Sequence, residues 1–340
     1  MRSLLVGVSL CASLLAAFQP VARSGVAPAR ATALTKVVLA TGFLPSVQFA
    51  PYYLAVDKGY YRAQGLDVQI MNGPSPTLPR QVADGTVDFY ITSGDALVSA
   101  RAAGIPVTYV MAQFQRYPVG AMVIAGNGVT LRSPADLKGR RIGISMPGSA
   151  TDIGLQALLR AGHLTERDVK VIAIGFTETQ SLARKQVDVA MTYLTNEPVQ
   201  ARALGYKVET LDTSKYITLI STGLATGART VQSRPALVQR MVTATLQGLR
   251  DTQMHPDQAL AASLKRMPEI ASNAKQVDIQ RQVLAATLAY EQPPVGHPLG
   301  WSDPKGWSTT ARFLKTIGIV KKTVVPAALY ANSFIDQATP

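Results

Sequence analysis

The stretch Leu66–Thr92, LDVQIMNGPSPTLPRQVADGTVDFYIT, decides the fold of this chain. Apolar residues alternate with polar ones over Leu66–Met71, follow a helical pattern over Leu78–Ala83, and form an apolar run over Val87–Thr92. A strand, a helix and a second strand in this order are the repeating unit of an α/β protein. The stretch therefore predicts an α/β fold.

The same alternation continues on both sides of this stretch. We predict further strands over Lys36–Ala40, Val107–Ala112, Arg141–Ser145, Val169–Ile174 and Val187–Leu194. We predict helices over Pro51–Gln64, Asp95–Ala103, Thr151–Ala161, Thr179–Lys185 and Glu197–Leu204. Ser133-Pro134-Ala135-Asp136 predicts one more helix start, because serine caps helices and proline suits their first position.

Two short sequences of the first half recur in the second half. Asp67-Val68-Gln69-Ile70 recurs as Asp168-Val169-Lys170-Val171, and Gly85-Thr86-Val87-Asp88 recurs as Lys185-Gln186-Val187-Asp188. Both pairs are offset by about one hundred residues, which is too long for a solenoid unit. The repeat therefore predicts two similar α/β lobes, each with a mixed sheet flanked by helices.

Helical periodicity dominates the C-terminal third, where Ser233 and Pro235 mark a helix start. Further helices are predicted over Pro256–Lys265, Ala271–Tyr290 and Pro304–Thr316. We expect this part to pack on the first lobe, so that lobe 1 comprises residues 34–122 plus 223–340 and lobe 2 comprises residues 123–222. The chain would then cross between the lobes near Ala121–Ala125 and near Leu219–Ala225. Two lobes joined by two crossings form a hinge, and the cleft between them is a favoured place for a ligand.

Residues 1–33 have the pattern of a signal peptide. Arg2 precedes an apolar run over Leu4–Phe18, and small residues in the Ala-x-Ala pattern follow, which places cleavage near Ala33. The apolar run is shorter than the ~20 residues that a membrane-spanning helix needs. Cys11, the one cysteine of the chain, lies inside this run and would be removed. We therefore expect an exported, periplasmic protein without cysteine.

Composition and motifs exclude several functions. The chain has 340 residues, 47% apolar and 16% charged, and its 34 basic and 21 acidic residues give a formal net charge of +13. The basic residues are scattered rather than gathered in a stripe with aromatics, so we expect no nucleic acid as partner. The three histidines (His163, His255 and His297) are far apart, and no Gly-x-Ser-x-Gly motif is present. We therefore expect no metal site, no cofactor and no catalytic residue.

Loops that follow the predicted strands carry the unusual residues, and ligands of α/β sheets bind at such loops. Aromatic rings there suit stacking on a flat molecule, and amide, hydroxyl and carboxyl groups suit its polar edges. Other interpretations stay open: each aromatic is as well explained by the core, Ser93 with Asp95 by helix capping, and Glu197 by a cap before Pro198. The candidate ligand-binding residues are Phe43, Gln48, Phe49, Tyr52, Ser93, Asp95, Gln115, Tyr117, Ser149, Thr151, Tyr193, Asn196 and Glu197.

Four stretches carry a resemblance to a known family. They are GFLPSVQFAPYYLAVDKGYYRAQGLDV over Gly42–Val68, VDFYITSGDALVSARAAGIPVTYV over Val87–Val110, SPADLKGRRIGI over Ser133–Ile144 and TNEPVQ over Thr195–Gln200. With these stretches the chain resembles the substrate-binding proteins of bacterial ABC importers that are related to thiamine-pyrimidine synthase. The resemblance covers most of the chain after residue 33.

The resemblance implies two lobes of the type II periplasmic-binding-protein fold that close on a planar heteroaromatic ligand. It is nearest to the riboflavin-binding branch, with the branch for thiamine pyrimidine precursors as the alternative. It implies that Phe43, Gln48, Tyr52, Gln115 and Tyr117 meet the ring from one lobe, and that Tyr193, Asn196 and Glu197 meet it from the other.

The resemblance also implies a partner and an activity class. We expect a monomer that passes its small-molecule ligand to an ABC permease in the membrane. The related synthases carry a cysteine-rich active-site motif, which this chain lacks. We therefore expect a binding protein rather than an enzyme.

Overall fold

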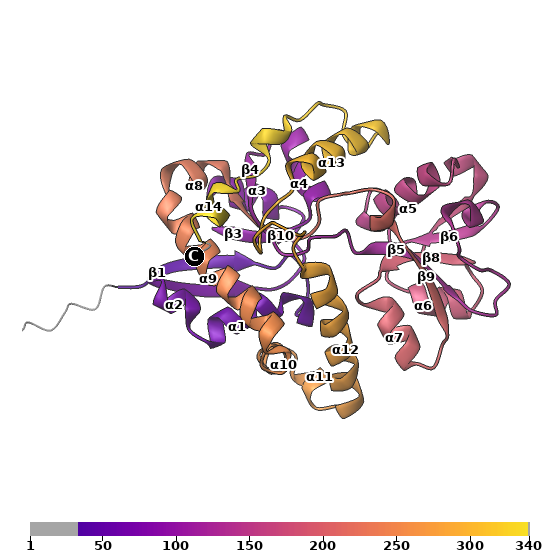
Figure 1. Cartoon of the computed structure of the whole chain (residues 1–340), viewed down its shortest axis with the longest axis horizontal. Coiled ribbons are helices and arrows are strands. Elements are labelled where there is room, and N and C mark those ends of the chain that lie inside the picture. The colour runs from indigo at the N-terminus through magenta and orange to yellow at the C-terminus, as the bar shows by residue number, and fades with distance from the viewer. Residues whose placement is uncertain (1–32, 339–340) are drawn as a thin grey trace, which may run out of the picture. The chain divides into compact units, whose positions relative to one another are not determined.

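The computed structural model describes residues 33–338, drawn from indigo to yellow in Figure 1. The predicted signal peptide lies outside these residues except for Ala33. From Leu34 onward the chain forms one compact unit. None of the helices in this part is long and apolar enough to cross a membrane.

A first sheet of five strands joins strands of residues 35–112 with one strand of residues 223–227. Its order is β2-β1-β3-β10-β4, in which β1 runs parallel to β2 and β3, whereas β10 runs antiparallel to β3 and β4. The strands are β1 (Thr35–Ala40), β2 (Leu66–Met71), β3 (Phe89–Thr92), β4 (Val107–Ala112) and β10 (Gly223–Gly227).

A second sheet of five strands has the same design. Its order is β7-β6-β8-β5-β9, with β6 parallel to β7 and β8, and β5 antiparallel to β8 and β9. Its strands are β5 (Val119–Ile124), β6 (Arg141–Ile144), β7 (Lys170–Ala173), β8 (Val189–Tyr193) and β9 (Val208–Asp212). The α/β fold with two mixed sheets, predicted from the repeat, is confirmed (Figure 1).

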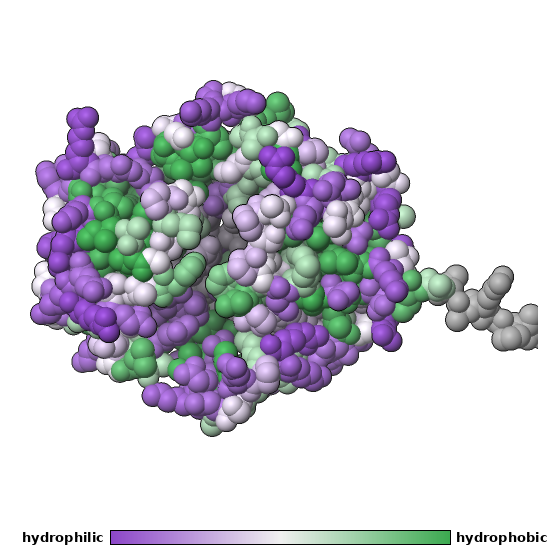
Figure 2. Space-filling model, turned by 180° about the vertical axis from the view of Figure 1, so that it is seen from behind, coloured by the Kyte–Doolittle hydropathy of each residue, from purple (hydrophilic) through white to green (hydrophobic). Residues whose placement is uncertain are grey.

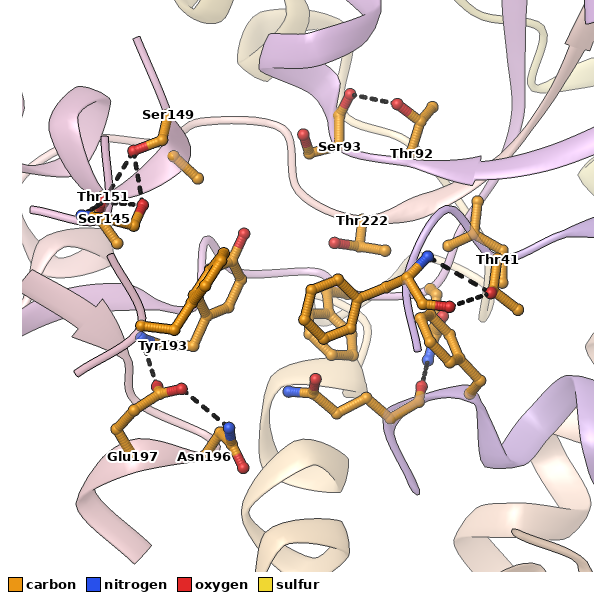
Figure 3. A pocket seen from close by; sticks show the side chains of 18 of the residues that line it. Thr41, Thr92, Ser93, Ser145, Ser149, Thr151, Tyr193, Asn196, Glu197 and Thr222 are labelled. Atoms are coloured by element: carbon orange, nitrogen blue, oxygen red, sulfur yellow. Dashed lines mark hydrogen bonds between the residues drawn. The ribbon is translucent and has the colours of Figure 1, made fainter. Parts of the chain in front are cut away.

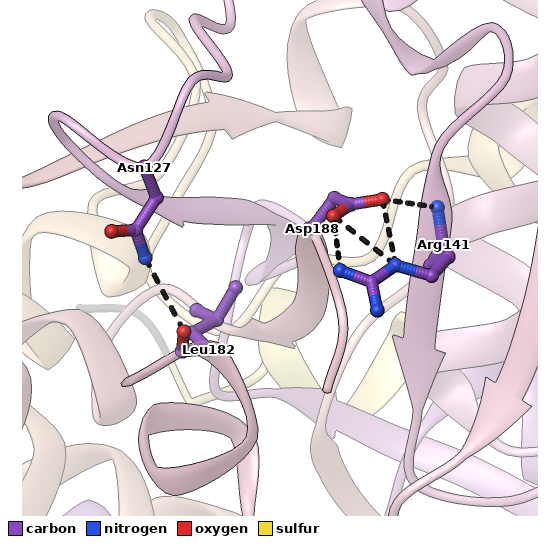
Figure 4. Close-up of polar contacts among 4 residues, drawn as sticks. All are labelled: Asn127, Arg141, Leu182 and Asp188. Carbon is purple, nitrogen blue, oxygen red and sulfur yellow. Dashed lines mark hydrogen bonds and ion pairs between the residues drawn. The ribbon is translucent and has the colours of Figure 1, made fainter. Parts of the chain in front are cut away.

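The aspartate of the repeated sequence has the same place in both sheets. Asp88 directly precedes β3 and accepts a hydrogen bond from the backbone N–H of Val38 in β1 at 2.9 Å. Asp188 directly precedes β8 and accepts one from the backbone N–H of Arg141 in β6 at 2.8 Å. The guanidinium of Arg141 adds a second contact to Asp188, with Nη2 at 2.7 Å (Figure 4). The sequence repeat thus marks a carboxylate that joins two parallel strands.

Helices cover both sheets and make up most of the C-terminal part (Figure 1). Those of the strand-containing part are α1 (Ala50–Asp57), α2 (Tyr60–Ala63), α3 (Leu78–Asp84), α4 (Gly94–Ala102), α5 (Ala150–Ala161), α6 (Glu178–Ala183) and α7 (Glu197–Ala203). Those that follow β10 are α8 (Ala228–Ser233), α9 (Pro235–Met254), α10 (Pro256–Leu264), α11 (Pro268–Ala271), α12 (Ala274–Glu291), α13 (Pro304–Thr316) and α14 (Ser333–Asp336).

Three expectations about elements need correction. The helix expected over Pro51–Gln64 is broken into α1 and α2, because Gly59 adopts a positive φ of 74° between them. The helix start at Ser133 leads only to a 3-10 turn over Pro134–Leu137, since the backbone is already extended at Lys138. The helix expected over residues 271–290 begins at Ala274, after the separate short helix α11.

The segments expected as lobe crossings are themselves strands. Residues 121–125 lie mostly in β5 and residues 219–225 lead into β10, and each strand pairs with two neighbours inside a sheet. The division into lobes stays a prediction, and sheet membership refines it. Residues 119–122 pair within the second sheet, so we propose that they belong to lobe 2 rather than to lobe 1.

Candidate functional site

A cavity of about 360 Å³ lies where the ends of strands from both sheets meet. The surface of the molecule is visibly hollowed in the space-filling view (Figure 2). Its lining comes from loops at the carboxyl ends of β1, β3, β4, β6, β7 and β8, which is where α/β sheets bind ligands. The lining residues are Thr41, Phe43, Gln48, Phe49, Ile91, Thr92, Ser93, Gln113, Phe114, Ser145, Met146, Ser149, Ala150, Thr151, Phe176, Glu178, Tyr193, Asn196, Glu197 and Thr222.

Five aromatic side chains line this cavity. Phe43 follows β1 and Phe176 follows β7, and their rings meet edge to face with centroids 6.4 Å apart. Both residues are exposed, Phe43 at 47% and Phe176 at 70%, so neither ring is part of the hydrophobic core. Phe49, Phe114 and Tyr193 complete the group. Aromatic faces with free area suit stacking on a planar ring.

A cluster of hydroxyl groups lies at the start of α5. The side-chain oxygens of Ser145, Ser149 and Thr151 are within 2.8–3.0 Å of one another (Figure 3). Ser149 caps the helix, because its Oγ accepts a hydrogen bond from the backbone N–H of Asp152. Hydroxyl groups both donate and accept, so this cluster offers a ligand either kind of hydrogen bond.

Glu197 is held by its own loop. Its carboxylate accepts a hydrogen bond from Thr192 Oγ1 at 2.6 Å. It also accepts hydrogen bonds from the backbone N–H of Tyr193 at 3.0 Å and from Asn196 Nδ2 at 2.8 Å (Figure 3). These partners position the end of β8 and the start of α7. Glu197 therefore shapes the cavity wall in addition to lining it.

Glu178 is a second carboxyl in the lining. Its side chain is only 5% exposed, and burial together with the nearby charge of Glu197 raises its pKa to about 7. Among the described residues no other residue donates a hydrogen bond to this carboxyl; its backbone N–H is the only donor. A buried carboxyl of this kind gains from any hydrogen-bond donor that a ligand brings.

A buried amide and a buried acid support the floor of the cavity. Gln113 Nε2 donates to the backbone oxygen of Gln48 at 2.7 Å and to Glu291 Oε1 at 2.8 Å. Burial raises the pKa of Glu291 to about 8, so its protonated form predominates at neutral pH. The side chain of Gln48 in turn reaches the other sheet, where its Nε2 donates to Thr195 Oγ1 at 2.8 Å.

The structure gathers most of the predicted ligand-binding residues in this one cavity. Their role as ligand contacts stays a prediction. The residues that line the cavity as expected are Phe43, Gln48, Phe49, Ser93, Ser149, Thr151, Tyr193, Asn196 and Glu197.

Four predicted residues lie outside the lining. Tyr52 is fully buried in α1, and Asp95 is buried in the first turn of α4. Gln115 points to the C-terminal part, where its Nε2 donates to the backbone oxygen of Trp301. Tyr117 is buried and its hydroxyl donates to the backbone oxygen of Ala150, so its ring serves packing.

Sequence reasoning missed several lining residues. Phe176 and Glu178 follow β7 at its carboxyl end, the same kind of position that singled out the other candidates. Glu178 lies just before the helix predicted over Thr179–Lys185, and nothing local in the sequence shows that its carboxyl is buried. The other missed residues are Thr41, Ile91, Thr92, Gln113, Phe114, Ser145, Met146, Ala150 and Thr222.

Several known proteins are similar to this chain over most of its length. The family model described as NMT1/THI5 like matches residues 46–259. The riboflavin-binding protein RibY of Chloroflexus aurantiacus is 36% identical, covering 91% of this chain and 88% of that protein. The formylaminopyrimidine-binding protein of Halalkalibacterium halodurans is 24% identical, covering 88% and 91%. Pyrimidine phosphate synthases are also among the relatives.

The fold itself recurs among solved structures. The periplasmic aliphatic sulphonate binding protein SsuA of Escherichia coli superposes with a TM-score of 0.68 at 16% identity, covering 87% of this chain and 91% of that one. At an identity this low, the similarity shows that the two proteins share a fold, and it does not show that they share a ligand. The chain therefore belongs to the NMT1/THI5-like family and has the fold of a type II periplasmic binding protein.

Proposed function

We propose that this protein is an exported solute-binding protein that captures riboflavin, or a similar planar heteroaromatic molecule, and delivers it to an ABC importer. The observation that carries the proposal is the cavity, in which five aromatic rings and the polar groups of both sheets surround one space. Its volume of about 360 Å³ falls in the range of about 300–1,000 Å³ that is usual for small-molecule sites.

Sequence similarity to named binding proteins supports riboflavin as the proposed ligand. The relative named for riboflavin binding is similar over nine-tenths of this chain, whereas the relative named for formylaminopyrimidine binding is less similar. A pyrimidine precursor is therefore the second ligand to examine. Both molecules are flat and nitrogen-containing, and both suit a cavity with aromatic faces and hydrogen-bonding edges.

The lining favours binding over catalysis. Among its described residues there is no histidine, cysteine or lysine, the side chains that most often act as base, nucleophile or Schiff-base amine. The serines of the lining bond to one another and to a threonine rather than to a base.

The partner and location follow from the same proposal. Residues 1–33 have the pattern of a signal peptide, which would export the chain to the periplasm. There a monomer with a loaded cavity would dock on a permease in the membrane. Release of the ligand into the permease would complete one cycle of import.

A titration of riboflavin with the chain from Leu34 to Pro340 tests the proposal. Free riboflavin is fluorescent, and stacking on the aromatic lining is expected to quench it in a saturable manner. Phe176→Ala is expected to weaken binding about tenfold, as for the loss of one stacked ring. Tyr206→Ala removes an exposed ring outside the lining and serves as the matched control.

Two other outcomes would change the proposal. If riboflavin is not quenched but calorimetry detects binding of 4-amino-5-hydroxymethyl-2-methylpyrimidine, the ligand is a pyrimidine precursor. If neither compound binds, the proposal of a heteroaromatic-binding protein is wrong.

A further inference from the structure

The charge of the cavity is opposite to the charge of the chain. The whole sequence carries 34 basic and 21 acidic residues. The described lining nevertheless contains two carboxyl groups, Glu178 and Glu197, and no lysine, arginine or histidine. Proteins that hold phosphate or sulfonate groups usually face them with arginine or lysine, because charge-assisted hydrogen bonds are the strong ones. This lining offers no such group.

Helix N-termini attract anions in principle, because they are positive. The capping residues of α4 and α5 both line the cavity, and each helix carries an acid in its first turn, Asp95 in α4 and Asp152 in α5, which offsets that charge. Asp152 Oδ2 accepts a hydrogen bond from the backbone N–H of Gly148 at 2.8 Å. The backbone N–H groups of Asp152 and Ile153 donate to the side chain and backbone of Ser149. These groups are therefore already engaged within the chain.

The carboxyl of Glu178 can accept further hydrogen bonds on the side of the cavity. It is 5% exposed, it lines the cavity, and no other described residue donates to its carboxyl. Glu197 differs, since three donors from its own loop already satisfy it. A ligand that presents a hydroxyl or an N–H group would give Glu178 a further donor, whereas an anionic group would be repelled.

We infer that the cavity selects a ligand without phosphate, sulfonate or carboxylate groups, and that this ligand donates a hydrogen bond to Glu178. The inference rests on the proposed function and narrows its ligand class. It sets this protein apart from the sulphonate-binding protein of the same fold. It also predicts discrimination between a vitamin and its phosphate ester, two molecules with the same ring.

Riboflavin and flavin mononucleotide are the probes, because they differ only by a phosphate on the side chain. At pH 8, where Glu178 is mostly ionised, riboflavin is expected to bind about 100-fold more tightly than its phosphate ester. Equal affinity for the two flavins would overturn the inference and leave the proposed function standing.

Substitutions of Glu178 then test its role. Glu178→Gln keeps an acceptor oxygen but removes the charge, so the preference for riboflavin over its phosphate ester is expected to fall about tenfold. Glu178→Leu removes the acceptor and is expected to weaken riboflavin about tenfold. Glu166→Gln neutralises an exposed acid outside the lining and is expected to change neither affinity. A Glu178→Leu variant that folds and binds riboflavin normally would overturn the proposed contact.

If the protein does not bind riboflavin, a second pair of ligands tests the inference: 4-amino-5-hydroxymethyl-2-methylpyrimidine and its phosphate. Binding of the neutral member alone supports the inference, and equal binding of both overturns it. If no neutral member of either pair binds, the proposed function fails and this inference fails with it.

Discussion

Glu291 shows how a single buried acid can support the cavity without touching a ligand. It is fully buried at the end of α12, and its Oε1 accepts a hydrogen bond from Gln113 of the lining. Gln113 Oε1 and Glu291 Oε2 have no partner among the described residues. Burial without a donor for Oε2 disfavours the ionised carboxylate and favours the protonated acid, which fits the raised pKa of this carboxyl.

The titration of Glu291 predicts how stability depends on pH. Burial raises its pKa from 4.5 to about 8, so its contribution to folding is fully present below pH 4.5 and is lost as the pH rises through 8. We expect Glu291→Gln, which needs no proton, to flatten this dependence. Relative to the variant, the wild type should lose about 3 kcal/mol of unfolding free energy between pH 5 and pH 8.

Urea unfolding of both proteins at pH 5, 6, 7 and 8 measures this loss. Glu269→Gln, at an exposed acid of α11, is the matched control and should follow the wild type at every pH. Parallel pH profiles for the wild type and Glu291→Gln would show that Glu291 is ionised in the folded protein.

Single residues also mark the limit of what the sequence could predict for the site. Phe43 and Tyr52 lie in the same aromatic segment, yet Phe43 lines the cavity and Tyr52 is buried in α1. A helix with one apolar face tells which residues point inward, but α1 is buried on nearly all sides. The loops that reach the site were therefore predictable, and the direction of each ring was not.

At the scale of elements, the repeated sequence lies where two helices end, and in each copy one residue there has a positive φ. Gly85, at the end of α3, has a φ of 86°, and Lys185, just after α6, has a φ of 55°. Glycine adopts a positive φ freely, whereas a lysine there has its Cβ close to the backbone. The second copy of the repeat thus carries a strained residue where the first carries glycine.

We expect Lys185→Gly to stabilise the protein by about 0.5–1 kcal/mol, because removal of the Cβ relieves this strain. Urea unfolding of the variant measures the gain. Lys185→Ala keeps the Cβ and serves as the control, with no gain expected. If both variants change stability equally, the effect comes from the lost charge and not from the backbone.

The elements also show why part of the fold escaped prediction. Strands such as β2 and β4 have the bounds that their apolar patterns indicate. The sequence predicts lobe crossings where β5 and β10 lie, and both strands pair antiparallel with strands that are distant in the chain. A local sequence pattern indicates whether a segment is buried and whether it is a helix or a strand. It does not indicate which distant strand the segment pairs with.

At the scale of the whole described unit, few polar contacts join the loops of the two sheets across the cavity. Gln48 Nε2 donates to Thr195 Oγ1, and the edge-to-face pair of Phe43 and Phe176 lies at the same cavity. A ligand that touches both sets of loops favours the arrangement in which they are close, and so shifts a pre-existing equilibrium. Contacts across the cavity therefore add to ligand affinity even where they touch no ligand.

Thr195→Val tests this coupling, because valine has the shape of threonine without the hydroxyl. Thr195 is fully buried, so the change removes the bond to Gln48 with little effect on packing. Loss of one hydrogen bond costs about 1 kcal/mol, and we expect riboflavin affinity to fall about fivefold. Thr195→Ser keeps the hydroxyl and is expected to bind as the wild type does. A Thr195→Val variant with unchanged affinity would mean that this bond does not contribute to the ligand-bound arrangement.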